Sequence, residues 1–98
     1  MNEPKYEIVK STAFKKGYKL AKKQGKDLAT LAWGINQLAA DIPLPPNWKD
    51  HELKGNYKGL RECHIGASAD WLLVYEKCDN EMILYLIGTG SHEDTLGV

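Results

Sequence analysis

The sequence predicts an α+β fold in which two N-terminal helices pack on a twisted, mostly antiparallel sheet of four to five strands, in the order β-α-α-β-β-β-β. Helical periodicity fills residues 12–41, and apolar runs separated by turn residues fill most of the chain after residue 50. A length of 98 residues supports a single hydrophobic core. We therefore expect one domain over residues 1–98.

The first strand and the first helix occupy the N-terminal quarter of the chain. Residues 5–10 alternate polar and apolar side chains, and Ser11 or Thr12 can cap a helix that runs to about Gln24 and stops at Gly25. On a helical wheel, one side carries Lys15, Lys19, Lys22 and Lys26, opposite Phe14, Gly17 and Ala21. The lysine side is typical of a solvated surface, and contact with RNA phosphates is the alternative.

A second helix and four further strands account for the rest of the chain. Asp27 can cap a helix whose apolar positions follow the i, i+3, i+4, i+7 rule to about Asp41, and three prolines then predict a loop over residues 43–47. Strands are expected near residues 51–53, 60–65, 71–78 and 82–88, the last two joined by a hairpin at Asp79 and Asn80. The helices should cover one face of the sheet and leave the other free for a site.

Charge and cysteine usage limit the class of protein. The net charge is zero, yet residues 1–26 carry eight lysines against two glutamates, whereas residues 27–98 carry five basic against eleven acidic side chains. Such polarity can place a basic surface on a neutral protein. Cys63 and Cys78 lack metal-type spacing, so reduced thiols are expected. No apolar run approaches about 18 residues and no signal-peptide core is present, so we expect a cytoplasmic protein.

Three histidines are the candidates for chemistry, and each is predicted near the end of an element: His51, His64 and His92. Imidazole exchanges protons near neutral pH, so converging histidines could take a proton from a ribose 2′-hydroxyl and give one to a departing 5′-oxygen. Ordinary surface histidines are the alternative. Metal binding is disfavoured because no HxH, HExxH or HxxxH spacing occurs. Trp71 and Tyr75 share one side of a predicted strand, where they could stack on bases or fill the core.

Five segments in the same order resemble the YafQ toxins of the RelE/ParE superfamily. They are residues 44–51 (LPPNWKDH), 53–55 (LKG), 59–65 (GLRECHI), 70–75 (DWLLVY) and 89–92 (TGSH). The N-terminal strand and helical pair are similar to the same family's first half. The resemblance therefore spans nearly the whole chain and implies a RelE-like fold.

The resemblance implies the toxin of a type II toxin–antitoxin pair that enters the A site of the 70S ribosome and cuts messenger RNA without a metal ion or other cofactor. It implies a DinJ- or RelB-like antitoxin encoded beside the toxin, whose complex with the toxin binds the shared promoter. Family residues with catalytic roles correspond to His51, His64, Asp70 and His92. We assign His92 as general acid, Asp70 or His51 as general base and His64 as charge stabiliser, giving a 2′,3′-cyclic phosphate. Candidate RNA-binding positions are Lys54, Arg61, Trp71 and Leu96.

Several features depart from that family pattern. Five residues separate His64 from Asp70 where the family usually has about three, so Asp70 could be displaced. Leu96 stands where an aromatic side chain is usual, and Gly88 stands where many relatives carry a basic one. Strict alternation also places Arg61 on the sheet face opposite His64. A non-catalytic module of the same fold, which poisons gyrase or acts only as corepressor, is the second hypothesis.

Overall fold

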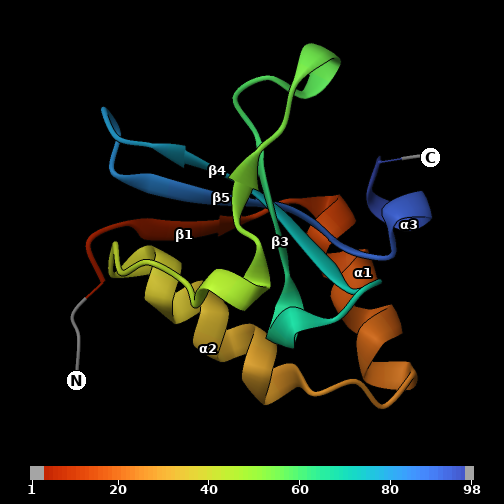
Figure 1. Ribbon diagram of the computed structural model, residues 1–98. Helices are drawn as coiled ribbons and strands as arrows, with labels where there is room; N and C mark the ends of the chain where they lie inside the picture. The colour runs from red at the N-terminus through yellow and green to blue at the C-terminus, as the bar shows by residue number, and fades with distance from the viewer. Residues whose placement is uncertain (1–3, 97–98) are drawn as a thin grey trace.

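The computed structural model describes residues 4–96, and the predicted order of strands and helices is confirmed (Figure 1). The strands are β1 (Glu7–Lys10), β2 (His51–Glu52), β3 (Arg61–His64), β4 (Leu72–Cys78) and β5 (Ile83–Gly90). The helices are α1 (Thr12–Lys23), α2 (Leu28–Ala39) and a short α3 (His92–Leu96), which the sequence analysis did not include. Three 3₁₀ turns, η1 (Pro46–Trp48), η2 (Gly55–Tyr57) and η3 (Ile65–Ala67), lie in the connections.

The five strands form one mixed sheet in the order β1-β5-β4-β3-β2. Only the β1 and β5 pair is parallel, so the prediction of a mostly antiparallel sheet is confirmed. A register shift between Val74 and Tyr75 interrupts the β4–β5 ladder. The two-residue strand β2 lies at the edge, and the loop after it projects beyond the sheet at the top of Figure 1.

Both long helices begin at the predicted caps. The Ser11 hydroxyl accepts the Phe14 N–H at 2.9 Å, and the Asp27 carboxylate accepts the Thr30 N–H at 3.2 Å. α1 packs closely on β5, since a Cβ added to Gly17 would lie 2.1 Å from the carbonyl oxygen of Thr89. The lysines of α1 are exposed, whereas Phe14 and Ala21 are buried. The predicted division of this helix into a basic and an apolar side is therefore confirmed.

One hydrophobic core lies between the helices and the sheet. It joins side chains from α1, α2, β3, β4, β5, the turns η1 and η3 and the segments beside them: Tyr6, Phe14, Ala21, Leu31, Ile35, Leu38, Ala39, Leu44, Trp48, Cys63, Ile65, Trp71, Leu73, Tyr75, Leu84 and Leu86. Trp71 is only 6% exposed and Tyr75 1% exposed. Of the two alternatives for these rings, the structure shows the core one, because Trp71 and Tyr75 face the helices. Burial of two large rings stabilises the fold through apolar area removed from water.

The ends of several elements differ from the prediction for local reasons. α2 ends at Ala39, and Asp41 adopts a left-handed φ of 61° that stops the helix. β3 ends at His64, because Ile65 begins η3, and β5 extends to Gly90 in register with Leu72. Cys63 and Cys78 are free thiols, as expected. Within residues 4–96, no helix is long and apolar enough to cross a membrane.

Candidate active site

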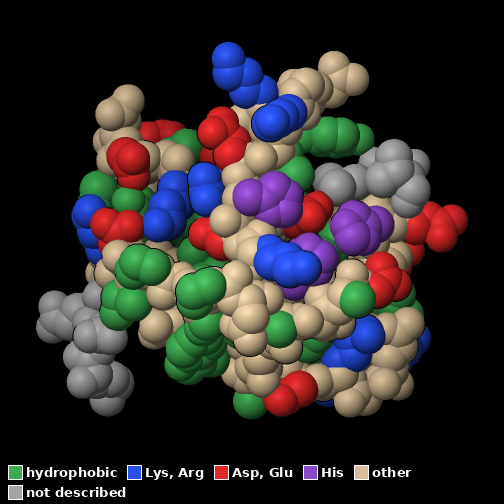
Figure 2. Space-filling model, viewed as in Figure 1, with side chains coloured by type: hydrophobic (Ala, Val, Ile, Leu, Met, Phe, Trp, Pro, Cys, Tyr) green, Lys and Arg blue, Asp and Glu red, His purple; other side chains and the backbone are tan. Residues whose placement is uncertain are grey.

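Alternation along β3 puts the candidate catalytic groups on the sheet face opposite the core. Cys63 is buried against the helices, so its neighbours Glu62 and His64 point to the other face. His51 on β2 stands opposite Glu62 in the ladder and shares this face. His92 opens α3, and Figure 2 shows the three histidines gathered on one exposed surface. The fold therefore brings His51, His64 and His92 to the same face of the sheet.

A buried glutamate lies between two of these histidines. Glu62 Oε1 is 3.7 Å from His51 Nε2 and 3.8 Å from His92 Nε2. The Glu62 side chain is 4% exposed, and its second oxygen, Oε2, is buried without a hydrogen-bond partner among the described residues. A buried carboxylate needs compensating donors, and an imidazole that is protonated at Nε2 would supply one beside Oε1. Glu62 was not predicted, although its spacing two residues before His64 places it on the histidine face.

Backbone carbonyls select the tautomer of two histidines. His51 Nδ1 lies 2.6 Å from the Lys49 carbonyl oxygen, and His64 Nδ1 lies 2.8 Å from the Ser68 carbonyl oxygen. A carbonyl can only accept, so each Nδ1 carries the hydrogen and each neutral ring presents a lone pair at Nε2. With 49% of its side chain exposed, His51 offers this lone pair at a surface open to substrate.

Asp70 remains beside His92 despite the longer turn. Its Oδ1 accepts the His92 backbone N–H at 3.4 Å and lies 3.7 Å from His92 Nδ1. The extra residues form η3, where Gly66 and Ala67 both take left-handed φ values of 61° and 64° and fold the turn back. The His64 and His92 rings meet edge to face with centroids 6.0 Å apart. His92 therefore has a carboxylate near each ring nitrogen.

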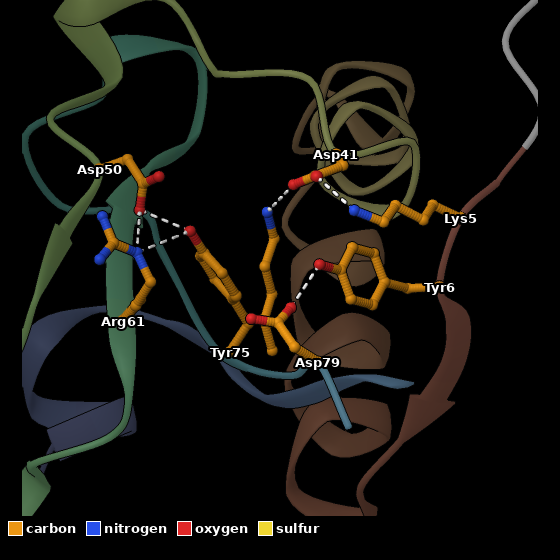
Figure 3. Close-up of polar contacts among 8 residues, drawn as sticks. Lys5, Tyr6, Asp41, Asp50, Arg61, Tyr75 and Asp79 are labelled. Carbon is orange, nitrogen blue, oxygen red and sulfur yellow. Dashed lines mark hydrogen bonds and ion pairs between the residues drawn. The ribbon is translucent and has the colours of Figure 1, made fainter. Parts of the chain in front are cut away.

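The predicted RNA-binding residues do not form one cluster around the histidines. Lys54 is exposed in the loop after β2, whereas Arg61 lies on the core face of β3, as alternation predicted. Figure 3 shows Arg61 with Asp50 and Tyr75: its Nε donates to Asp50 Oδ1 and to the Tyr75 hydroxyl oxygen, both at 3.3 Å. Trp71 is buried with the Lys26 ammonium 5.5 Å from its ring centroid. The Leu96 side chain lies outside the described part of the chain.

In the part of the chain covered by the structure, no three His, Cys, Asp or Glu side chains are placed to hold a metal ion. Glu62 Oε1 lies 3.7 and 3.8 Å from the two imidazole nitrogens, a distance at which opposite charges attract without a direct hydrogen bond. The face can bring a base, an acid and an anion to one bound phosphodiester.

The model of the family described as "Bacterial toxin of type II toxin-antitoxin system, YafQ" matches residues 6–97. The chain belongs to the YafQ family. The mRNA interferase toxin YafQ of Escherichia coli K12 is 36% identical over 92 residues, which cover 93% of this chain and 96% of that protein. The family predicted from the sequence motifs is thus confirmed.

Solved structures of YafQ and of another bacterial toxin show the same fold. The toxin in the E. coli DinJ–YafQ toxin–antitoxin complex has a TM-score of 0.79 and 36% identity, covering 90% of this chain and 93% of that one. A metal-bound toxin from Helicobacter pylori has a TM-score of 0.83 and 42% identity, covering 91% and 97%. The relatives' names describe messenger RNA cleavage, an antitoxin partner and, in one crystal structure, a bound metal.

Proposed function

We propose that this YafQ family member is a messenger RNA endoribonuclease that cuts in the ribosomal A site without a metal ion, as a single toxin domain over residues 1–98 acting in the cytoplasm. The observation that carries the proposal is the exposed face on which Glu62 Oε1 lies within 3.8 Å of two imidazole Nε2 atoms. Two imidazoles on one carboxylate form an acid and base pair for transesterification.

The chemistry divides between the two histidines. His51 Nε2 takes the proton of the ribose 2′-hydroxyl, the 2′-oxygen attacks phosphorus, and the bond to the 5′-oxygen breaks. His92 gives its proton to that 5′-oxygen, so the products are a 2′,3′-cyclic phosphate and a 5′-hydroxyl. Asp70 and Glu62 orient His92 as the acid, and Glu62 stabilises the imidazolium that forms at His51. His64, beside His92, stabilises charge on the phosphorane.

The proposed partners are the ribosome with its bound messenger and a DinJ- or RelB-like antitoxin, whose complex with the toxin binds promoter DNA. The exposed lysines of α1 and Lys54 offer contacts to RNA phosphates, while Arg61, Trp71 and Leu96 stay predictions as RNA ligands. A groove of about 380 Å³ between α1 and α2 has an apolar floor that includes Phe14, Leu31 and Ile35. Lys10, Lys15 and Lys19 also line this groove, so it suits an acidic, amphipathic antitoxin segment.

Primer extension on a defined messenger bound to 70S ribosomes tests the function. The wild-type chain should cut within the A-site codon, the cuts should survive EDTA, and His92→Ala should abolish them while antitoxin binding persists. Loss of cleavage in EDTA with recovery on added metal would overturn the metal-free mechanism and favour a bound ion, as in the H. pylori relative. Growth arrest by a wild-type chain that makes no cuts would favour a non-catalytic toxin.

A further inference from the structure

The strand that carries His51 has little holding it in the sheet. β2 contains two residues, pairs on one side only and is exposed along its length. It follows η1 and the left-handed residue Lys49, whose φ is 52°. A non-glycine residue at positive φ persists only where the surroundings hold it. The position of the His51 ring therefore depends on contacts made by its neighbours in sequence.

The residue before His51 makes those contacts on the opposite face of the sheet. The Tyr75 hydroxyl donates to Asp50 Oδ1 at 2.6 Å, and Arg61 Nε donates to the same oxygen at 3.3 Å (Figure 3). Tyr75 is 1% exposed in the core of β4, and Arg61 lies on β3, so both donors belong to the interior strands. Trp48, two residues before Asp50, anchors the same segment, with its ring near Gly34 and 5.5 Å from that of Trp33.

We propose that Tyr75 and Asp50, joined by Arg61, are positioning residues that fix β2 so that the His51 imidazole stays within reach of Glu62 and the substrate. Adjacent residues of a strand point to opposite faces, so anchoring the Asp50 side chain behind the sheet sets the direction of His51 in front of it. The Tyr75 hydroxyl is the key donor because it makes the shorter contact and its ring is buried in the core. The expected fall in kcat rests on the proposed ribonuclease function, whereas the expected displacement of the His51 ring does not.

Tyr75→Phe removes this donor and keeps the ring that fills the core. The side-chain Cε1–Hε1 resonances of the three histidines report the result: the His51 resonance should shift or broaden, while those of His64 and His92 stay in place. In ribosome-dependent cleavage, kcat should fall about tenfold with KM changed less than about twofold, since a misplacement of roughly 1 Å can cost about 10²-fold. Asp50→Ala should reproduce both effects, and Asp50→Asn, which retains an acceptor oxygen, should restore most of kcat.

Tyr85→Phe is the matched control, because the Tyr85 hydroxyl on β5 makes no hydrogen bond within residues 4–96. An unmoved His51 resonance in folded Tyr75→Phe would overturn the proposal. So would equal shifts of all three histidines, which would show a general loosening of the fold. If Asp50→Ala fails to fold, Tyr75→Phe and Asp50→Asn still test whether Tyr75 and Asp50 position His51. If the wild type cuts no messenger, the ribonuclease function fails while the His51 resonance continues to test the positioning.

Discussion

Replacing Glu62 by Gln tests the centre of the proposed mechanism while keeping the side chain's shape. Two opposite charges at the His51 separation of 3.7 Å attract by about 4.5 kcal/mol at an effective dielectric constant of about 20 and by about 1.1 kcal/mol in bulk water. The His51 side chain is 49% exposed, so the lower end applies and we take ~1–2 kcal/mol. This free energy acts when His51 becomes an imidazolium, so kcat should fall about 5- to 30-fold.

Single-turnover cleavage of ribosome-bound messenger measures this loss, and urea unfolding checks that the variant remains folded. Glu52→Gln is the matched control, because Glu52 is an exposed carboxylate on the neighbouring strand whose partner in the ladder is Arg61, not Glu62. We expect the control to cleave as the wild type does. Cleavage by folded Glu62→Gln at the wild-type kcat would refute the reasoning, since no charge at this position would then contribute to the transition state.

Three further predictions concern stability and reactivity. Gly17→Ala would place a methyl group 2.1 Å from the Thr89 carbonyl oxygen. Although alanine favours a helix by about 1 kcal/mol, urea unfolding should show a net loss of roughly 1–2 kcal/mol in the free energy of unfolding. Equal or greater stability would contradict the close packing of α1. Hydrogen bonds from Lys5 and Lys77 hold the pKa of Asp41 at about 2, below its ordinary 3.8. The Asp41 carboxylate therefore contributes fully to the free energy of unfolding above about pH 4, and this contribution disappears toward pH 2. The difference in stability between wild type and Asp41→Asn should close across that pH range. Burial raises the pKa of the Cys63 thiol to about 12, so iodoacetamide at pH 8 should modify Cys78 in the folded protein and Cys63 only after unfolding; rapid modification of both would refute the burial of Cys63.

Local signals account for the elements that were predicted well. Ser11 and Asp27 predict where their helices begin, because capping depends on a short polar side chain at one position. The structure shows both caps. The ends of strands were harder, since pairing decides them. β5 extends to Gly90 because this residue pairs with Leu72 of β4, and β2 ends at Glu52, the last residue that pairs with β3. α3 was missed because five residues carry too little periodicity to detect.

The candidate site was predictable to the extent that it depends on residue chemistry. The three histidines and Asp70 were identified and do converge, because imidazoles at element ends meet when the strands pair. Glu62 was missed: in isolation, Glu62 in a short strand reads as an ordinary exposed carboxylate. Its place in the candidate site depends on cross-strand contact with His51 and on the position of His92 at the start of α3. Both contacts are tertiary and cannot be predicted from local sequence.

Alternation along β3 explains why one short strand serves both the core and the proposed chemistry. Arg61 and Cys63 face the helices, while Glu62 and His64 face the side on which we propose that RNA binds. A shift of one residue in this register would bury His64 and expose Cys63. The Asp50 contacts to Tyr75 and Arg61 resist such a shift, because the shorter bond links β4 to the residue just before β2, across β3. The polar contacts behind the sheet therefore stabilise the same register on which the arrangement of Glu62 and His51 depends.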